Sequence, residues 1–582
     1  MRVSVNHPLH TIIMVSTRSA ICNAAATRTI KSSLRSERRA LLHMTDSNGM
    51  KTCMLFRNFL GAVIGFVLSV STAHAADKPN VVFILADDLG YGDLSHTGGR
   101  AGTPHCDRLA KQGMRFTDSH TTSSVCTPTR YGIVTGRYNW RSTLKSGVLW
   151  GLSEPLIAAD RLTTPKFLQK NGYHTGVIGK WHLGLGWQML PNGEKRQAVT
   201  GPTKGDGWQI DYGKKVTGGP LAIGFDESFI IPASLDMFPY VYLKNDKPTA
   251  WATVTKAFHR PGPCAENFEA INCLRDFARE AGTFIDARAK ERNKPFFLYL
   301  PLTSPHTPIV PAKRWQGKSD IGKYGDFLME TDWVVGQVLE ALDRNKLAKD
   351  TIVIFTADNG CSPAAKIPNL IKQGHKPNGD WRGHKADIFE GGHRTPFLVR
   401  WPDKVEAGST SNQTICTTDL FATIAAVLGK SESIPANAAE DSFSFLPALL
   451  GQEQAKQRPF TIHHSINGSF AIRRGKWKLV LCPGSGGWSA PKPAAAKKNT
   501  NLPTVQLYDL EKDPAESTNL QAQRPKLVQN LVTTLAKAIK NGRTTPGQIQ
   551  ANEGHPNTFS QKLLTAFPAL GQSSTLPRQT DF

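Results

Sequence analysis

Two short segments of the sequence carry side chains that could hold a metal ion. Asp87 and Asp88 follow one apolar run, and Asp358 and Asn359 follow another. Carboxylate and amide oxygens are the ligands that a hard divalent cation prefers. Each pair alone is also typical of a solvated turn after a strand. Together, at equivalent positions after two strands, they predict a metal site.

Two further apolar runs lead to residues that could bind an anion or transfer a proton. Lys180 and His182 follow one of them, and His306 lies just beyond the other. A lysine can stabilise negative charge that develops in a transition state, and histidine is the most frequent general acid or base. A single lysine is usually a solvated surface charge, so it is the position after a strand that makes these residues candidates.

The four apolar runs are typical of buried strands, because each is short and bounded by turn residues. Helical periods lie between them, at residues 327–342 and 419–428. This alternation predicts an α/β fold with an open, mostly parallel sheet, and ligands bind such sheets at the carboxyl ends of the strands. We therefore expect a single active site at the ends of these runs, which are residues 80–86, 175–179, 295–301 and 351–356.

The segment that begins at Cys126 is the most specific motif of the chain. It reads Cys-Thr-Pro-Thr-Arg, ends at Arg130, and is followed by Gly-Ile-Val-Thr-Gly-Arg at residues 132–137. It resembles the signature of the formylglycine-dependent sulfatases of the alkaline-phosphatase superfamily, which is Cys-x-Pro-x-Arg continued by Leu-x-Thr-Gly-Arg. Ile133 and Thr129 depart from the commonest residues without touching the core of the motif.

The resemblance covers about residues 79–520 and does not depend on one motif. Further blocks match the family in order and approximate spacing. They are residues 179–182, 224–226, 304–306, 357–360, 382–385, 390–394, 508–510 and 513–514.

The resemblance implies that Cys126 is oxidised to formylglycine before the protein folds. A hydrated aldehyde offers two hydroxyls on one carbon: one attacks the sulfur of the ester, and deprotonation of the other lets sulfate leave. An unmodified cysteine could not perform the second step. In this scheme Asp87, Asp88, Asp358 and Asn359 bind the metal together with the modified residue 126. Ca²⁺ fits these oxygen ligands, and Mg²⁺ is an alternative.

The resemblance also assigns roles to the remaining candidates. Arg130 would hold the hydrated aldehyde, and Lys180 and Lys385 would bind the sulfuryl oxygens. His182 would take the proton of the second hydroxyl, and His306 would protonate the leaving alcohol. Ser234 would contact the sulfate, but its alignment is loose and an ordinary loop serine is an equal alternative.

The N-terminal 76 residues differ from the rest of the chain. Met50 is followed by two basic residues, a 12-residue apolar run at 59–70 and an Ala-His-Ala site at 73–75, which is the order of a secretory signal peptide. We therefore expect residues 1–49 to be a wrongly assigned extension, residues 50–76 to be a signal peptide, and the product to be periplasmic or extracellular. A genuine basic pre-region or transit peptide is the alternative.

Removal of residues 1–76 changes the charge and the cysteine count. The net charge of +23 falls to +16, because nine basic and two acidic residues are lost. That charge suits an enzyme that attracts a polyanionic substrate, and no motif supports nucleic-acid binding. Seven cysteines remain, so conversion of Cys126 would leave six, enough for up to three disulfides. Cys264 and Cys273 are the closest pair in sequence and candidates for one bridge, while the sequence leaves the connectivity open.

The last part of the chain predicts a smaller α+β domain. Residues 471–480 alternate like a half-exposed antiparallel strand, residues 506–510 resemble its partner, and Pro525 opens an amphipathic helix that Asn541-Gly542 closes. We place a catalytic domain at residues 77–460 and a C-terminal subdomain at 461–582.

Long loops near the strand ends could carry substrate specificity. One is the Gly- and Lys-rich insertion at 184–224, and another is residues 374–379. His375, Arg382 and His384 are candidates for a subsite, with loop scaffolding as the alternative.

The function predicted from the sequence is hydrolysis of sulfate monoesters of carbohydrates by an exported arylsulfatase-like enzyme. A phosphodiesterase or phosphonate monoester hydrolase of the same superfamily is the alternative, and a non-catalytic carbohydrate-binding protein is a more distant one. The expected partners are a sulfated carbohydrate and, during biogenesis, a formylglycine-generating or sulfatase-maturing enzyme. Beyond the signal peptide no apolar segment is long enough for stable membrane insertion.

Overall fold

The computed structural model describes residues 78–200, 206–452, 458–554 and 559–571. They belong to one unit that begins at Lys78. The expected extension at 1–49 and the expected signal peptide at 50–76 lie outside the described residues. Within the described ranges, none of the helices combines the length and the apolar composition that crossing a membrane requires.

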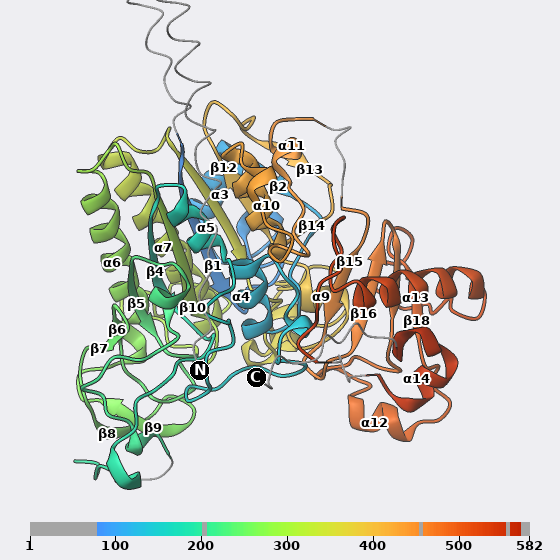
Figure 1. Ribbon diagram of the computed structural model, residues 1–582, viewed down its shortest axis with the longest axis horizontal. Coiled ribbons are helices and arrows are strands. Elements are labelled where there is room, and N and C mark those ends of the chain that lie inside the picture. Colours follow the sequence, from blue (N-terminus) through green and yellow to red (C-terminus); the bar gives the residue numbers. More distant parts are fainter. Residues whose placement is uncertain (1–77, 201–205, 453–457, 555–558, 572–582) are drawn as a thin grey trace, which may run out of the picture. The chain divides into compact units, whose positions relative to one another are not determined.

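The centre of the fold is a mixed sheet that has ten strands among these residues (Figure 1). Strands β11, β1, β10, β4 and β5 run parallel to one another, and β12 lies antiparallel beside β11. The order across the sheet is β13 (Ser409–Ser411), β2 (Met114–Phe116), β12 (Phe397–Arg400), β11 (Thr351–Ala357), β1 (Asn80–Asp87), β10 (Phe296–Pro305), β4 (His174–Lys180), β5 (Glu227–Ile231), β6 (Leu243–Lys244) and β7 (Lys247–Pro248).

The register brings the ends of the central strands to one edge. Asp87, the last residue of β1, pairs with Pro305 at the end of β10, and Ala86 pairs with Ala357 at the end of β11. Lys180, the last residue of β4, pairs with Ile231 of β5. Parallel strands that end together must place the residues that follow them close together, so the sheet itself assembles the site.

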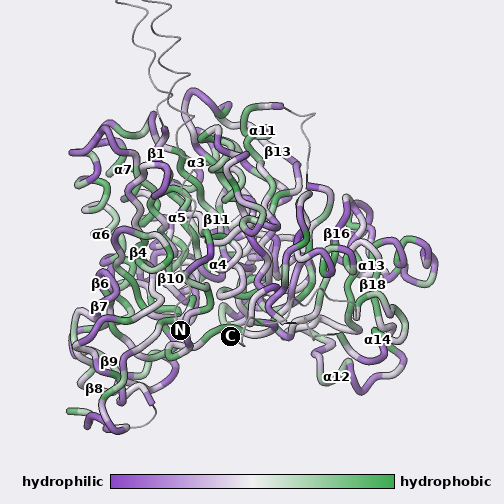
Figure 2. Tube along the Cα trace, in the orientation of Figure 1, coloured by the Kyte–Doolittle hydropathy of each residue, from purple (hydrophilic) through white to green (hydrophobic). Residues whose placement is uncertain are grey.

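Helices cover both faces of the sheet, which is why every residue of β1, β10 and β11 is buried. One group is α3 (Pro104–Gln112), α6 (Cys273–Arg288) and α7 (Lys323–Arg344); the other is α4 (Cys126–Thr135), α5 (Thr164–Lys170) and α10 (Leu420–Val427). Figure 2 shows the matching pattern, with hydrophobic central strands and hydrophilic outer loops.

The C-terminal part forms a four-stranded antiparallel sheet next to α13 (Pro525–Lys540). Its strands are, in order, β15 (Thr461–His464), β16 (Phe470–Arg474), β17 (Trp477–Val480) and β18 (Gln506–Asp509). The predicted fold class, a large mostly parallel α/β domain with a smaller antiparallel α+β part, is confirmed.

The prediction of one half-exposed strand over residues 471–480 is wrong in two respects. The segment is a hairpin, because the chain turns at Gly475, where φ is 56°. Both faces of the hairpin are also covered: Ile472 packs in the same hydrophobic cluster as Leu531 of α13, and Ala471 packs with Ile388.

The remaining elements are short. They are a hairpin of β8 (Ala252–Ala257) and β9 (Pro261–Ala265), the pair β3 (Ser119–His120) and β14 (Ile415–Cys416), and the helices α8 (Ile367–Lys372), α9 (Glu390–His393), α11 (Leu446–Leu449), α12 (Pro493–Lys498) and α14 (Gln561–Ala566).

The expected bridge between Cys264 and Cys273 is absent, and all seven cysteines of the described residues are free thiols. Each thiol of this pair has its own polar neighbour. The sulfur of Cys264 lies 3.2 Å from the carbonyl oxygen of Ala265, and the sulfur of Cys273 accepts a hydrogen bond of 3.3 Å from the Tyr242 hydroxyl.

Candidate active site

The four predicted metal ligands meet at the carboxyl edge of the sheet. The side-chain amide of Asn359 donates to Asp88 Oδ1 at 2.8 Å, and the Asp88 backbone N–H donates to Asp358 Oδ1 at 3.2 Å. All four residues are buried. Among the described residues, Asp87 Oδ1, Asp88 Oδ2 and Asn359 Oδ1 have no hydrogen-bond partner. Unpaired buried oxygens are costly, and three of them in one place fit a hard cation.

Cys126 lies beside this cluster as the first residue of α4. Single ligand atoms of Asp87, Asp88, Cys126 and His306 lie within 4.8 Å of one another. Burial raises the pKa of the Cys126 thiol to about 11, although the charges of Lys180 and Lys385 oppose the shift. The unmodified residue is therefore protonated at neutral pH and is a weak nucleophile.

Arg130 joins two of the strand ends. It lies four residues after Cys126 on the same face of α4, where its Nε and Nη2 donate to Asp358 Oδ2 at 3.1 and 2.7 Å. Its Nη1 donates to the carbonyl oxygen of Lys180 at 3.0 Å. The guanidinium is completely buried, so its position is fixed by these bonds.

Two lysines face the acidic cluster. Lys180 Nζ lies 2.6 Å from Asp87 Oδ2, and Lys385 Nζ lies 2.6 Å from Asp88 Oδ1. Burial alone would raise the pKa of Asp87, but the charges of Lys180, His306 and Arg130 hold it well below its usual range. Burial and the charge of Asp87 raise the pKa of Asp358 to about 7, against the opposing charge of Arg130.

Ser234 is placed inside the cluster, despite its loose alignment. Its hydroxyl lies 3.3 Å from Lys180 Nζ and 3.3 Å from His306 Nδ1. His306 Nε2 in turn lies 3.6 Å from Asp88 Oδ2. Burial lowers the pKa of His306, with the charge of Asp88 opposing the shift.

His182 has a defined tautomer. Its Nε2 lies 2.7 Å from the carbonyl oxygen of Leu149 and must donate, so Nδ1 carries the lone pair. That Nδ1 atom is buried and has no partner among the described residues. Burial and then the positive charges of Lys180 and Arg130 lower the pKa of His182 well below its usual range, so the ring is a neutral acceptor.

The three candidate subsite residues of the loops have other partners. His375 is fully buried; its Nε2 lies 2.8 Å from Asp93 Oδ1, and its Nδ1 accepts from a backbone N–H. Arg382 lies 3.8 Å over the ring of Phe389, and His384 Nδ1 lies 2.9 Å from the carbonyl oxygen of Lys385. The full burial of His375 supports the scaffolding alternative for this residue, whereas Arg382 and His384 are half-buried and stay candidates for a subsite.

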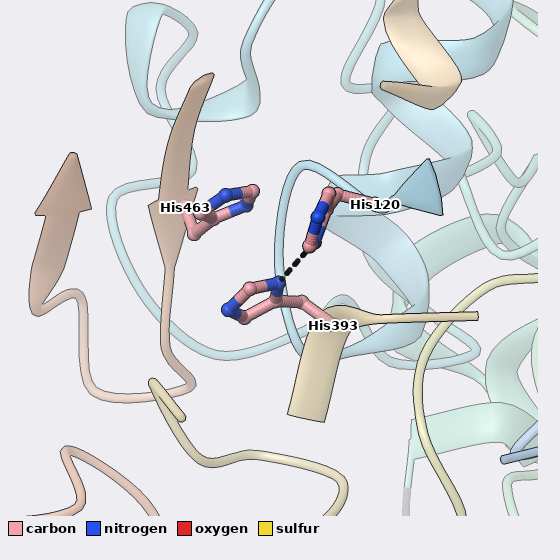
Figure 3. Close-up of side chains that lie close together, drawn as sticks. All are labelled: His120, His393 and His463. Carbon is pink, nitrogen blue, oxygen red and sulfur yellow. Dashed lines mark hydrogen bonds between the residues drawn. The ribbon is translucent and has the colours of Figure 1, made fainter. Parts of the chain in front are cut away.

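A second cluster of buried histidines, which the sequence did not predict, consists of His120, His393 and His463 (Figure 3). They come from β3, α9 and β15, so the cluster joins the central domain to the C-terminal sheet. No motif connects these residues, because each lies in a different segment.

The histidine cluster forms a hydrogen-bonded chain between charged groups. Lys478 Nζ lies 3.0 Å from His393 Nε2, the two Nδ1 atoms of His393 and His120 lie 3.0 Å apart, and His120 Nε2 lies 2.9 Å from Asp118 Oδ1. With neutral rings, the donors run in that order from Lys478 through His393 and His120 to Asp118, and Arg473 Nη1, which lies 2.6 Å from His120 Nε2, then donates to Asp118 instead.

This second cluster is unsuited to a metal. The rings of His393 and His463 stack with centroids 3.8 Å apart and an interplanar angle of 8°, although one nitrogen of each of the three histidines lies within 4.8 Å of the others. Lys478 and Arg473, which lie 3.0 and 2.6 Å from ring nitrogens, also place positive charge where a cation would bind.

The fold and the first cluster define a class of enzyme. Carboxylates, lysines and histidines surround one cysteine at the carboxyl edge of an α/β sheet, an arrangement suited to hydrolysing the ester of an oxyanion. The family model described as Sulfatase matches residues 79–430. The chain belongs to the sulfatase family and is a sulfuric ester hydrolase, as its sequence motifs predict.

Proteins with similar sequences align with most of this chain. An N-acetylgalactosamine-6-O-sulfatase of Bacteroides thetaiotaomicron is 34% identical over 512 residues, which cover 80% of this chain and 94% of that protein. Human arylsulfatase A is 32% identical over 526 residues, covering 85% and 95%. A solved structure from work on the metabolism of multiple glycosaminoglycans by B. thetaiotaomicron has a TM-score of 0.68 at 31% identity and covers 80% of this chain and 99% of that chain.

Proposed function

We propose that this sulfatase hydrolyses sulfate esters of carbohydrates with formylglycine at position 126 and Ca²⁺ as the metal. The main support for the proposal is that ligand atoms of Asp87, Asp88, Cys126 and His306 lie within 4.8 Å of one another. In the same place, one side-chain oxygen each of Asp87, Asp88 and Asn359 has no hydrogen-bond partner among the described residues. The carbohydrate substrate is supported by the similarity to the N-acetylgalactosamine-6-O-sulfatase.

The modified residue and the metal would supply a nucleophile and a divalent positive charge, which the unmodified side chains do not provide. The hydrated aldehyde would supply a nucleophilic hydroxyl, and the cation would lower the pKa of that hydroxyl and offset the negative charge of the sulfate. Asp87, Asp88, Asp358 and Asn359 would hold the cation, and Mg²⁺ is the alternative to Ca²⁺. The pKa of about 11 of the Cys126 thiol supports a requirement for modification.

The remaining residues divide the work of binding and proton transfer. Lys180, Lys385 and Ser234 bind the sulfuryl oxygens, and Arg130 fixes residue 126 through its buried bonds to Asp358. His306 donates a proton to the leaving alcohol.

His182 acts as a base at its unpaired Nδ1. Because Nε2 is held by the carbonyl oxygen of Leu149, that lone pair keeps one orientation. The proposed role of His182 as a base is thus supported by the tautomer that the hydrogen bond to the Leu149 carbonyl oxygen imposes.

We also propose how the chain matures. Residues 50–76 act as a signal peptide that exports the enzyme to the periplasm or the medium, and a formylglycine-generating or sulfatase-maturing enzyme acts on Cys126. The catalytic domain extends over 77–460 and the C-terminal subdomain over 461–582. N-terminal sequencing of the exported protein tests the first point: a start near residue 77 is expected, and a retained peptide from 1–49 would contradict it.

Release of free sulfate tests the function. The enzyme, produced together with a maturation enzyme, is assayed with sulfated saccharides and with nitrophenyl esters of sulfate, phosphate and phosphonate. We expect sulfate release from saccharides and a preference for the sulfate ester among the nitrophenyl substrates. A large preference for the phosphorus esters would instead support the phosphonate hydrolase alternative.

A further inference from the structure

Next to the catalytic cluster, an exposed tryptophan and an arginine form a pair. Trp150 is 53% exposed, which is unusual for so large an apolar side chain. The Arg260 guanidinium carbon lies 5.0 Å from the centroid of the Trp150 ring, and the Arg260 side chain is 37% exposed. Arg260 lies between β8 and β9, the hairpin at the lower left of Figure 1.

The segment that carries Trp150 is tied to the catalytic residues. The backbone N–H of Leu149 donates to the hydroxyl of Thr127, the neighbour of Cys126, at 3.2 Å. The carbonyl oxygen of Leu149 accepts from His182 at 2.7 Å. Trp150 therefore directly follows Leu149, whose backbone is hydrogen-bonded both to the neighbour of Cys126 and to His182.

The Arg260 side of the pair is connected to the cluster through Asp236. Arg260 Nη1 donates to the Asp236 carbonyl oxygen at 3.0 Å and to its carboxylate. Asp236 is 7% exposed and lies two residues after Ser234, which contacts Lys180 and His306. Its Oδ1 has no hydrogen-bond partner among the described residues.

Close packing holds the two segments together. A Cβ at Gly151 would lie 1.8 Å from the carbonyl oxygen of Phe238, and a Cβ at Gly262 would lie 2.4 Å from the Phe238 ring. The turn after Trp150 and the hairpin of Arg260 thus both pack against Phe238, and neither could move apart without losing this contact. This packing holds Trp150 and Arg260 in fixed positions relative to each other.

We propose that Trp150 and Arg260 form a subsite for an anionic sugar next to the sugar that carries the reacting sulfate. The inference rests on the proposed carbohydrate sulfatase function. A sugar ring packs its apolar face on Trp150, and the guanidinium binds a carboxylate or a second sulfate. Asp236 is a positioning residue that holds Arg260 through Nη1, which leaves the other guanidinium N–H groups directed to the ligand.

The test compares oligosaccharides that share the sulfated sugar but differ in its neighbour, which carries a uronate carboxylate, a second sulfate or no charge. Nitrophenyl sulfate, which has no neighbouring sugar, is the fourth substrate. Arg260→Gln should lower kcat/KM about tenfold or more for one or both anionic neighbours and leave the neutral neighbour and nitrophenyl sulfate nearly unchanged. The neighbour that loses more identifies the anion.

Trp150→Ala should lower kcat/KM for all three saccharides but not for nitrophenyl sulfate, and Trp150→Phe should restore most of the loss. Arg292→Gln is the matched charge control, because Arg292 is exposed and precedes β10 at the end of the strand opposite to His306.

Equal losses on all four substrates, or no loss with Arg260→Gln, would overturn the subsite. If the wild-type enzyme released no sulfate at all, the proposed function would fail, and calorimetric binding of the same saccharides to wild type and Arg260→Gln would still decide the subsite.

Discussion

The guanidinium of Arg130 donates through both Nε and Nη2 to a single oxygen of Asp358, and both side chains are completely buried. This pair fixes the first turn of α4, which carries Cys126, against the end of β11, which carries two candidate metal ligands. The geometry of the active site therefore depends on one buried ion pair.

Replacement of Arg130 by methionine should destabilise the protein by about 3–5 kcal/mol, because it leaves Asp358 buried without its counter-charge. Urea unfolding measures the change. The matched control is Arg344→Met, which breaks a similar pair with Asp286 at 2.8 Å on the surface and should cost at most about 1 kcal/mol. Equal effects of the two substitutions would contradict the account of the buried pair.

Ca²⁺ should raise the melting temperature of the protein after treatment with a chelator. The unpaired oxygens of Asp87, Asp88 and Asn359 are satisfied only when a cation binds, and a ligand present at a hundredfold excess over its Kd stabilises by about 2.7 kcal/mol. Asp88→Asn should abolish the shift, whereas Asp343→Asn, at an exposed pair with Arg108, should keep it. A melting temperature of the wild type that is insensitive to both Ca²⁺ and Mg²⁺ would speak against the metal site.

His306→Asn should affect substrates according to their leaving groups. A sugar alcohol needs a proton to leave, so its hydrolysis should slow about 10²–10⁴-fold, whereas nitrophenolate leaves without one and should lose much less. Steady-state rates with both substrates measure the difference. The same loss on both would assign His306 to binding rather than to proton donation.

The second histidine cluster should make the fold sensitive to acid. Burial lowers the pKa of His463 well below its usual value, with the charges of His120 and Lys478 adding to the shift. The unfolded chain binds a proton near pH 6.5, so the stabilisation is complete above that pH and is lost as the pH falls below it, toward the lower folded pKa.

Of the carboxylates that face this cluster, two stay ionised in that range and one does not. Two carboxylates, Asp118 and Glu390, have lowered pKa values and stay ionised, because the positive charges of Arg394 and Lys478 outweigh the effect of burial. Burial raises the pKa of Glu516 to about 7, so the folded protein takes up a proton there as the pH falls, which opposes the loss of stability caused by His463.

His463→Gln should therefore reduce the change in unfolding free energy between pH 6.5 and 5.5 by about 1 kcal/mol, because the unfolded histidine goes from half to about nine-tenths protonated and one full proton corresponds to ~1.4 kcal/mol per pH unit. Urea unfolding at several pH values gives the slope. An unchanged slope would show that His463 is protonated in the folded state.

The sequence predicted what local patterns encode. The apolar runs before Asp87, Lys180 and Asp358 identified the buried strands, and parallel strands bring their ends together by necessity. Residues that depend on tertiary contacts were missed or misjudged. The turn at Gly475 was hidden in an alternating pattern, and the contact of Trp150 with Arg260 joins segments 110 residues apart, which no spacing rule connects.

The most direct test of the central claim is the mass of the peptide that contains residue 126. Trypsin cleavage after Arg115 and Arg130 releases residues 116–130, in which Cys126 is the only cysteine. In fully active enzyme we predict an aldehyde, which has lost one sulfur and two hydrogens and gained one oxygen relative to cysteine. Full activity with only the unmodified thiol at position 126, or full activity of Cys126→Ala, would contradict the account.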